Sequence, residues 1–369
     1  MATSRGRART ILALSAVFIF ALSFPSLSSL ARDKEKGPRI HLTPLFQKGQ
    51  TLRYRIDTQT AIEGTTTSPI SNPEGAKTED RSMSVELTID VLGPPPPAPS
   101  SGSSSPSAAP PDTTSEAARL RVTYDFADAT STSDAYDPAA AAFESAYKNL
   151  QGRSMEFTLS PSGSITNVIG LEDLFANPSV AQSVKSWMSG FNYSGGLPQE
   201  GIAVGQKWSR EIPADDLPLG GLVWRLESTY LRDEPCAPRT PPDTETPPRA
   251  ASPAPPTPAN PPSDVCAVIL TESTLVRKGS SHADSTPPDY LRNGLRTSGT
   301  WIATGESLDS LSLHSGWIVL STRTVTDQMD YEIKSVRSGK ALHHTGSVKT
   351  RSQISMLPPV SPAPRAPSR

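Results

Sequence analysis

Apolar and polar side chains alternate with a period of two over most of this chain. In the first such segment, Leu52, Tyr54 and Ile56 alternate with charged residues. Successive side chains of a β-strand point to opposite faces of the sheet, so the pattern predicts strands that are buried on one face only. Antiparallel sheets tolerate one wet face, whereas parallel sheets are covered on both faces and show continuous apolar runs. The alternation therefore predicts an antiparallel sheet.

The same pattern recurs often enough to predict ten or eleven strands. In the third segment, Leu120, Val122, Tyr124 and Phe126 are all expected on the buried face. The run 317–333 is weakly apolar at Ser321 and Arg323, which predicts a bend or a bulge there. The segments are 52–56, 83–91, 120–126, a hairpin over 155–165, 207–212, 222–231, 265–276, 299–304, 308–313, 317–333 and 342–356.

Two helices are expected among these strands. The first begins at Asp137 and Pro138, a cap followed by a proline in the first turn, and ends before Gly152. The second begins at Leu171 and restarts at Asn177 and Pro178. Its apolar residues recur at helical spacing, which predicts a stripe that packs against the buried side of the sheet.

This apolar stripe is the candidate ligand-binding site. It has two interpretations, a filled core between helix and sheet, or the lining of a cavity that holds an apolar ligand. The sequence pattern does not separate them. The candidate residues are Phe175, Val184, Trp187, Met188 and Phe191.

Three proline-rich tracts are expected to be disordered. They are 93–117, 235–264 and the tail 357–369, and they hold many of the 38 prolines of the 369-residue chain. Such composition favours open coil, because it buries too little apolar surface to offset the entropy of ordering. The first two tracts lie between strands that can pair, so we interpret them as expanded hairpin tips. The sequence therefore predicts one domain over 32–356.

The first 31 residues have the pattern of a secretion signal. Arg5, Arg7 and Arg9 precede an apolar stretch from Ile11 to Phe24, and Ala31 closes a small-residue cleavage site. The alternatives are a cleaved signal peptide and an uncleaved N-terminal anchor. Either one predicts export to the periplasm or to the outside of the cell.

Export changes the interpretation of the two cysteines, because oxidising compartments permit disulfides. Cys236 and Cys266 flank the tract 235–264 and lie opposite each other if the flanking strands pair. A bridge closing about 30 residues stabilises by roughly 3 to 4 kcal/mol. The alternative is two free thiols. A metal site is not expected, since two isolated cysteines do not make a tetrahedral set.

Charge and motifs argue against nucleic-acid binding and against catalysis. Without the leader, 32 basic side chains face 37 acidic ones, and no basic stripe is present. Ser145 and Lys148 fit the S-x-x-K pattern but lack its partner motifs. His343 and His344 are adjacent on a strand, so they point to opposite faces and share no metal. We therefore expect no enzyme activity, no cofactor, no metal and no nucleic-acid partner.

The order of these segments resembles secreted bacterial proteins of unassigned activity, many from acidobacteria. Those proteins are themselves similar to lipoprotein carriers of the LolA and LppX type. The resemblance implies an antiparallel sheet curved around helices as a half-barrel, with a site for acyl chains. The matching stretches are 83–89, 119–124, 157–165, 204–208, 266–269 and the region 299–317.

Together these observations predict an α+β protein in which a curved, mostly antiparallel half-barrel sheet packs on two helices and carries long disordered proline-rich loops. The leading functional hypothesis is an exported, non-enzymatic protein that binds a lipid or another apolar ligand. The alternative is an envelope or extracellular interaction protein. Its proline-rich loops would meet a protein or cell-wall partner.

Overall fold

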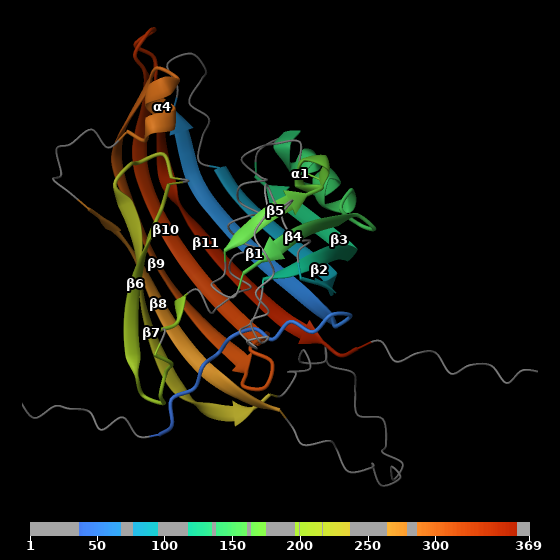
Figure 1. Ribbon diagram of the computed structural model, residues 1–369. Coiled ribbons are helices and arrows are strands. Elements are labelled where there is room, and N and C mark those ends of the chain that lie inside the picture. Colours follow the sequence, from blue (N-terminus) through green and yellow to red (C-terminus); the bar gives the residue numbers. More distant parts are fainter. Residues whose placement is uncertain are drawn as a thin grey trace, which may run out of the picture. The chain divides into compact units, whose positions relative to one another are not determined.

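The structure is a computed structural model (Figure 1). It describes residues 37–67, 77–94, 117–134, 138–160, 164–174, 196–198, 200–215, 217–236, 264–278 and 286–359. The predicted leader 1–31, most of the three proline-rich tracts and most of the second predicted helix lie outside these ranges. The single-domain boundaries therefore stay a prediction.

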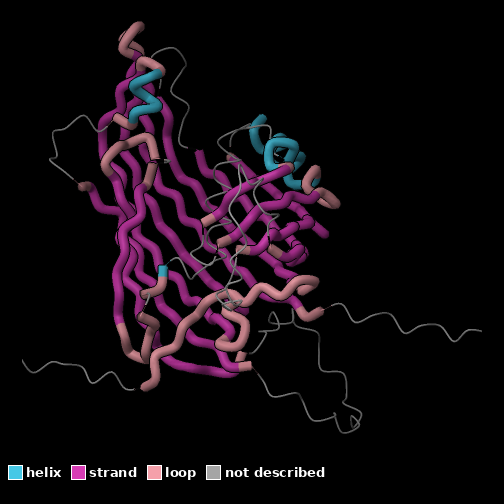
Figure 2. The backbone as a smooth tube through the Cα atoms, viewed as in Figure 1, coloured by secondary structure: helices cyan, strands magenta, loops and turns pink. Residues whose placement is uncertain are grey.

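The described residues form one eleven-stranded sheet (Figure 2). In the described part of the chain every pair of neighbouring strands is antiparallel, as the alternation predicts. The strands are β1 (Thr51–Thr67), β2 (Lys77–Gly93), β3 (Ala118–Ser133), β4 (Ser154–Leu159), β5 (Ile165–Ile169), β6 (Lys207–Pro213), β7 (Leu222–Pro235), β8 (Val265–Arg277), β9 (Leu295–Ser312), β10 (Ile318–Ser335) and β11 (Ala341–Leu357).

Strand order across the sheet is β5-β4-β3-β2-β1-β11-β10-β9-β8-β7-β6. Neighbours in space are neighbours in sequence except at the centre, where β1 pairs with β11 from Arg53 opposite Leu357 to Thr67 opposite His343. The tracts 93–117 and 235–264 each join strands that pair with each other, β2 with β3 and β7 with β8. The sheet is thus two meanders joined through its first and last strands.

The predicted α+β class, with the sheet packed on two helices, is wrong. The described helices are short: α1 (Pro138–Lys148) has 11 residues, α2 (Leu171–Leu174) has 4 and α4 (Pro288–Arg292) has 5. The first predicted helix is present as α1, whereas only the first turn of the second is described. The molecule is mostly one antiparallel sheet, because the alternating segments pair with one another along nearly their whole length.

The main apolar cluster lies on one face of β1 to β4, which we call the core face. Directly opposite residues share a face, and the register aligns Tyr54 with Leu87 and Leu87 with Tyr124. Leu150 in the turn after α1, Leu171 of α2 and Trp317 complete the cluster. The strand members are Leu52, Tyr54, Ile56, Val85, Leu87, Ile89, Val91, Ala118, Leu120, Val122, Tyr124, Ala127, Met155, Phe157 and Leu159.

Ion pairs within and between strands lie on the opposite face of the same strands. The Arg55 guanidinium lies 2.9 Å from the Asp57 carboxylate, and Arg121 lies 2.7 Å from Glu156. Exposed pairs of this kind stabilise little, typically about 0.2 to 1 kcal/mol. This face is therefore a solvated surface, and folding depends on the core face.

The prediction that Phe126 lies on the buried face is wrong. Glu86 pairs with Phe126 and Leu87 with Tyr124, so Asp125 is an extra residue in β3 and forms a bulge. The Thr88 hydroxyl donates to the Asp125 carboxylate at 2.6 Å. A bulge reverses the phase of the alternation, so Ala127 is buried and Phe126 is 42% exposed.

A second correction concerns the predicted break between 299–304 and 308–313. Both segments belong to the single strand β9, which pairs with β10 without interruption from Leu295 to Ser310. The stretch between them, Gly305 to Ser307, contains no apolar side chain, which is the composition expected of a turn. Pairing on both sides keeps this polar stretch extended. The bulge predicted near Ser321 lies one to three residues earlier, between Ile318 and Leu320.

We expect substitution on the core face to destabilise the protein far more than the same substitution on the opposite face. Ile56 is 2% exposed and Ile302 is 59% exposed. Ile56→Ala should lower the free energy of unfolding by about 2 to 5 kcal/mol, because it leaves a cavity. Ile302→Ala should change it by no more than about 0.5 kcal/mol. Urea denaturation of both variants measures this, and equal losses would contradict the assignment of faces.

Candidate functional site

On the other half of the sheet the core face carries polar side chains between two smaller apolar clusters, one with Tyr230, Ile269 and Leu311 and one with Leu222, Leu275 and Ala303. Register places one polar side chain from each of six neighbouring strands in a line, which we call the polar row. Each member is the direct partner of the next. From β7 to β1 they are Ser228, Thr271, Ser307, Arg323, Ser352 and Thr58.

The polar row is covered at one end and open at the other. Ser228 and Thr271 are buried and share a hydrogen bond of 2.8 Å between their hydroxyl oxygens. Ser352 and Thr58 are half-buried, and Arg323 is exposed. Buried hydroxyls are destabilising unless they find partners. The buried members of the row satisfy this requirement by bonding to each other.

A buried carboxylate adjoins the polar row. Asp309 of β9 lies opposite Ser321 of β10 and is 4% exposed. Its two oxygens accept hydrogen bonds from Ser321 Oγ at 2.5 Å and from Ser307 Oγ at 3.0 Å. Burial raises the pKa of Asp309, and the two serine hydroxyls and the charge of Arg323 oppose that rise. The loss of hydration thus affects the pKa of Asp309 more than its hydrogen-bond partners and the charge of Arg323 do.

A second carboxylate lies further along β10. Asp327 accepts a hydrogen bond of 3.0 Å from Trp301 Nε1. Burial raises its pKa, while Trp301 and Arg323 oppose the rise. Arg323 therefore lies within electrostatic range of both carboxylates. Among the described residues none forms an ion pair with Arg323.

Beyond the polar row the core face becomes apolar again. Ile62 of β1 pairs with Val348 of β11, which pairs in turn with Asp327 of β10. On the core face of β10, Asp327 lies between Val325 and Met329. We call Ile62, Val325, Met329 and Val348 the apolar patch. All four are half-buried, and none belongs to the packed apolar clusters of the described residues.

Three aromatic rings border the apolar patch. Tyr331 stacks on Trp301 with ring centroids 5.6 Å apart and on His344 at 4.9 Å. His344 Nδ1 lies 3.0 Å from the Thr66 hydroxyl, and burial lowers the pKa of the imidazole. Gly299 lies opposite Tyr331, where any side chain would meet the Asp330 carbonyl. The rings form a rigid rim.

The two adjacent histidines have separate partners, as their alternation predicts. His343 Nε2 lies 2.7 Å from an Asp330 carboxylate oxygen on the opposite face.

Ser145 and Lys148 are exposed on α1. Among the residues that the structure describes, no group of three or more His, Cys, Asp or Glu side chains is arranged to hold a metal ion.

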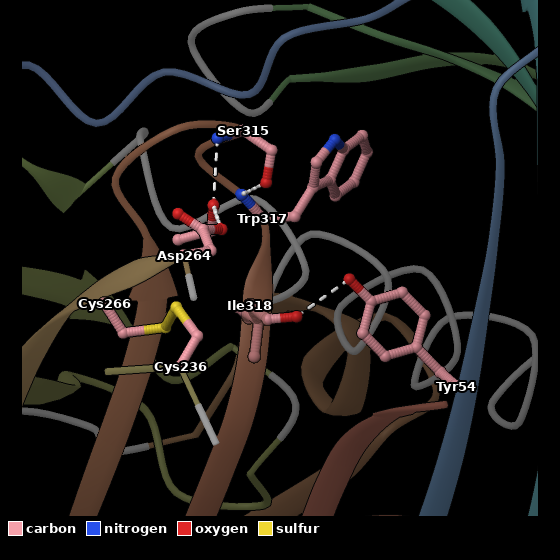
Figure 3. The surroundings of a disulfide bond; sticks show 8 residues. Tyr54, Cys236, Asp264, Cys266, Ser315, Trp317 and Ile318 are labelled. Atoms are coloured by element: carbon pink, nitrogen blue, oxygen red, sulfur yellow. Dashed lines mark hydrogen bonds between the residues drawn. A yellow bond between two sulfur atoms is a disulfide. The ribbon is translucent and has the colours of Figure 1, made fainter. Parts of the chain in front are cut away.

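The predicted disulfide between Cys236 and Cys266 is present, with Cα atoms 5.0 Å apart (Figure 3). The Cys236 amide donates to the Asp264 carbonyl at 2.7 Å, and Ser312 Oγ donates to the Asp264 carboxylate. The bridge thus holds the base of the tract between β7 and β8 against β9. A disulfide is consistent with an oxidising, exported location. None of the described helices is long and apolar enough to cross a membrane.

Tyr54 of β1 is tied to the same region (Figure 3). Its hydroxyl is fully buried and donates to the Ile318 carbonyl at 2.9 Å, and burial raises its pKa. A buried tyrosine hydroxyl needs such a partner. The bond joins β1 to β10 across the intervening strand β11.

The residues predicted to bind ligand all lie outside the described residues: Phe175, Val184, Trp187, Met188 and Phe191. The structure brings together a different set, the polar row, Asp309, Asp327 and the apolar patch. A signal for it was present in the sequence, since Ser321 and Arg323 interrupt an apolar alternation. From the sequence alone the interruption predicts a bend or a bulge, because strand partners are not readable from a single segment.

No protein-family model matches the sequence. A search of curated proteins finds no similar sequence. The resemblance to LolA-like carriers therefore stays a prediction.

Solved structures give weak likenesses only. A structure of lipid–protein interactions in lipovitellin has 11% identity and a TM-score of 0.41, over 87% of this chain and 26% of that chain. DynF from the dynemicin biosynthesis pathway of Micromonospora chersina has 9% identity and a TM-score of 0.15, over 87% and 85%. An outer membrane channel from Pseudomonas putida F1 has 7% identity and a TM-score of 0.17, over 85% and 98%. These scores carry no functional argument.

We expect the disulfide to stabilise the fold. Replacing both Cys236 and Cys266 with alanine should lower the free energy of unfolding by about 2 to 5 kcal/mol. Reductant should destabilise the wild-type protein to a similar extent and leave the double variant unchanged. Urea denaturation with and without reductant checks this. Two free thiols in the mass of exported protein would contradict it.

We expect Asp309 to make stability depend on pH. Its pKa in the folded protein lies above the ordinary value of 3.8, so its contribution to stability is full below that value. The contribution is lost as the pH rises through the folded pKa. Relative to Asp309→Asn, wild type should therefore lose stability as the pH rises above about 4. Urea denaturation at several pH values measures this. If the free energies of unfolding of wild type and Asp309→Asn depended on pH in the same way, the burial of the Asp309 charge would be contradicted.

Proposed function

We propose that this chain is an exported, non-enzymatic protein whose core face binds the apolar part of a lipid-like ligand. The observation that carries the proposal is the apolar patch. Its four side chains are adjacent on β1, β10 and β11, partly exposed, and outside every packed cluster of described residues. Single exposed apolar side chains are ordinary, whereas a contiguous set points to a binding surface.

The surroundings of the apolar patch support the same function. Trp301, Tyr331 and His344 stack at one end, so their rings are fixed before a ligand arrives. A rigid surface loses little entropy on binding, which favours affinity. Asp327 lies within the patch, between Val325 and Met329. It accepts a hydrogen bond from Trp301, which lowers the cost of placing apolar groups next to it.

The export part of the proposal has separate support. The Cys236–Cys266 disulfide is consistent with an oxidising compartment, and the sequence pattern of residues 1–31 is that of a secretion signal. The alternative function, in which proline-rich loops meet a protein or cell-wall partner, stays a prediction. Its tracts lie largely outside the described residues.

Titration of the mature protein with a fluorescent long-chain acyl probe tests the proposal, and we expect saturable binding. Met329→Asp places a charge on the apolar patch and should weaken binding by about tenfold or more, because the ligand would bury that charge. Ile302→Asp puts the same charge on the opposite face and should leave binding unchanged.

Three outcomes would contradict the proposal. The first is the absence of saturable binding to the folded wild-type protein. The others are an equal loss of affinity in the two variants and a loss of affinity confined to Ile302→Asp. Circular dichroism of all three proteins shows whether each is folded.

A further inference from the structure

Arg323 is the exposed cation at the middle of the polar row. It lies between Ser307 on β9 and Ser352 on β11, and no described carboxylate is paired with it. The other arginine nearby on the core face differs. Arg81 Nε lies 2.6 Å from the Glu79 carboxylate, and its guanidinium lies over the Phe143 ring. Arg323 is thus free to pair with a ligand.

The two carboxylates near Arg323 are engaged elsewhere. Asp309 accepts hydrogen bonds from Ser307 and Ser321, and Asp327 accepts one from Trp301. Each is within electrostatic range of Arg323 but forms no ion pair with it. The N–H groups of the Arg323 guanidinium therefore stay available for a ligand, and their geometry matches the two oxygens of a carboxylate.

The apolar patch begins beside Arg323. Val325 is the next residue on the core face of β10, and Met329 lies six residues from Arg323, about 20 Å along an extended strand. Thr350 of β11 lies opposite Val325 and shares a hydroxyl contact of 3.4 Å with Thr60. One unpaired guanidinium beside hydroxyls, followed by a mostly apolar surface whose carboxylate Asp327 is already hydrogen-bonded to Trp301, is complementary to an amphiphile with one negative charge at its head.

We propose that Arg323 selects long-chain carboxylates as the ligand of this face, an inference that rests on the proposed function. The carboxylate pairs with the Arg323 guanidinium, and the hydrocarbon chain follows β10 and β11 over Val325, Val348 and Met329. Arg323 offers the ligand one cation, while Asp309 and Asp327 are hydrogen-bonded to Ser307, Ser321 and Trp301. A phosphate monoester, with a charge nearer two, would leave part of its charge without a cation.

Competition experiments with the folded, mature protein test this assignment. A long-chain fatty acid and the alcohol of the same chain length each displace a neutral fluorescent acyl probe. Wild type should bind the acid at least about tenfold more tightly than the alcohol, as expected for a charged hydrogen-bonded pair. Arg323→Gln should remove this preference and leave the affinity for the alcohol unchanged.

The matched control is Arg351→Gln, an exposed arginine on the opposite face of β11. It should keep the preference for the acid. Equal binding of acid and alcohol by wild type, or a preference that survives Arg323→Gln, would overturn the role of Arg323 while the proposed function stands. Failure of both ligands to bind would overturn both. The wild-type comparison needs no variant, so it decides the matter even if Arg323→Gln does not fold.

Discussion

The pairing of the first strand with the last is the interaction on which the rest of the structure depends. β1 and β11 stay in register from Arg53 and Leu357 to Thr67 and His343. All other neighbours in the sheet are neighbours in sequence, so this one contact turns two meanders into a single sheet. It also makes the core face continuous. A slip of one residue would exchange the two faces of β1 relative to β11 and separate the apolar cluster from the polar row.

The continuous face carries two kinds of surface with different roles. On β1 to β4 it is a filled apolar core, closed by residues of α1, α2 and the segment before β10. On β7 to β10 it holds two smaller apolar clusters and, between them, buried hydroxyls and the carboxylate of Asp309, whose pKa burial raises. Such groups weaken a core, since each must find partners to offset its lost hydration. Local departures from good packing are typical of functional sites. We therefore place the proposed ligand beside the polar row.

Period-two alternation was sufficient to predict the antiparallel strands, because it reports directly which side chains face a core. The disulfide was also predictable, since Cys236 and Cys266 flank one tract between strands that pair. The fold class was not predictable in the same way. The α+β prediction assumed that the second helix covers the sheet, and helical spacing does not show what a helix packs against. Phe126 was misplaced because a bulge at Asp125 depends on the partner strand. The polar row spans six strands, so no single segment displays it.

Photo-crosslinking with a long-chain acyl probe, followed by peptide mapping, tests the central claim most directly. The claim is that a ligand's hydrocarbon chain lies on the core face where β1, β10 and β11 meet. The account predicts saturable crosslinks at Ile62, Met329 or Val348, which unlabelled fatty acid competes away. Crosslinks confined to the opposite face, such as at Ile302, or none that saturate, would contradict it.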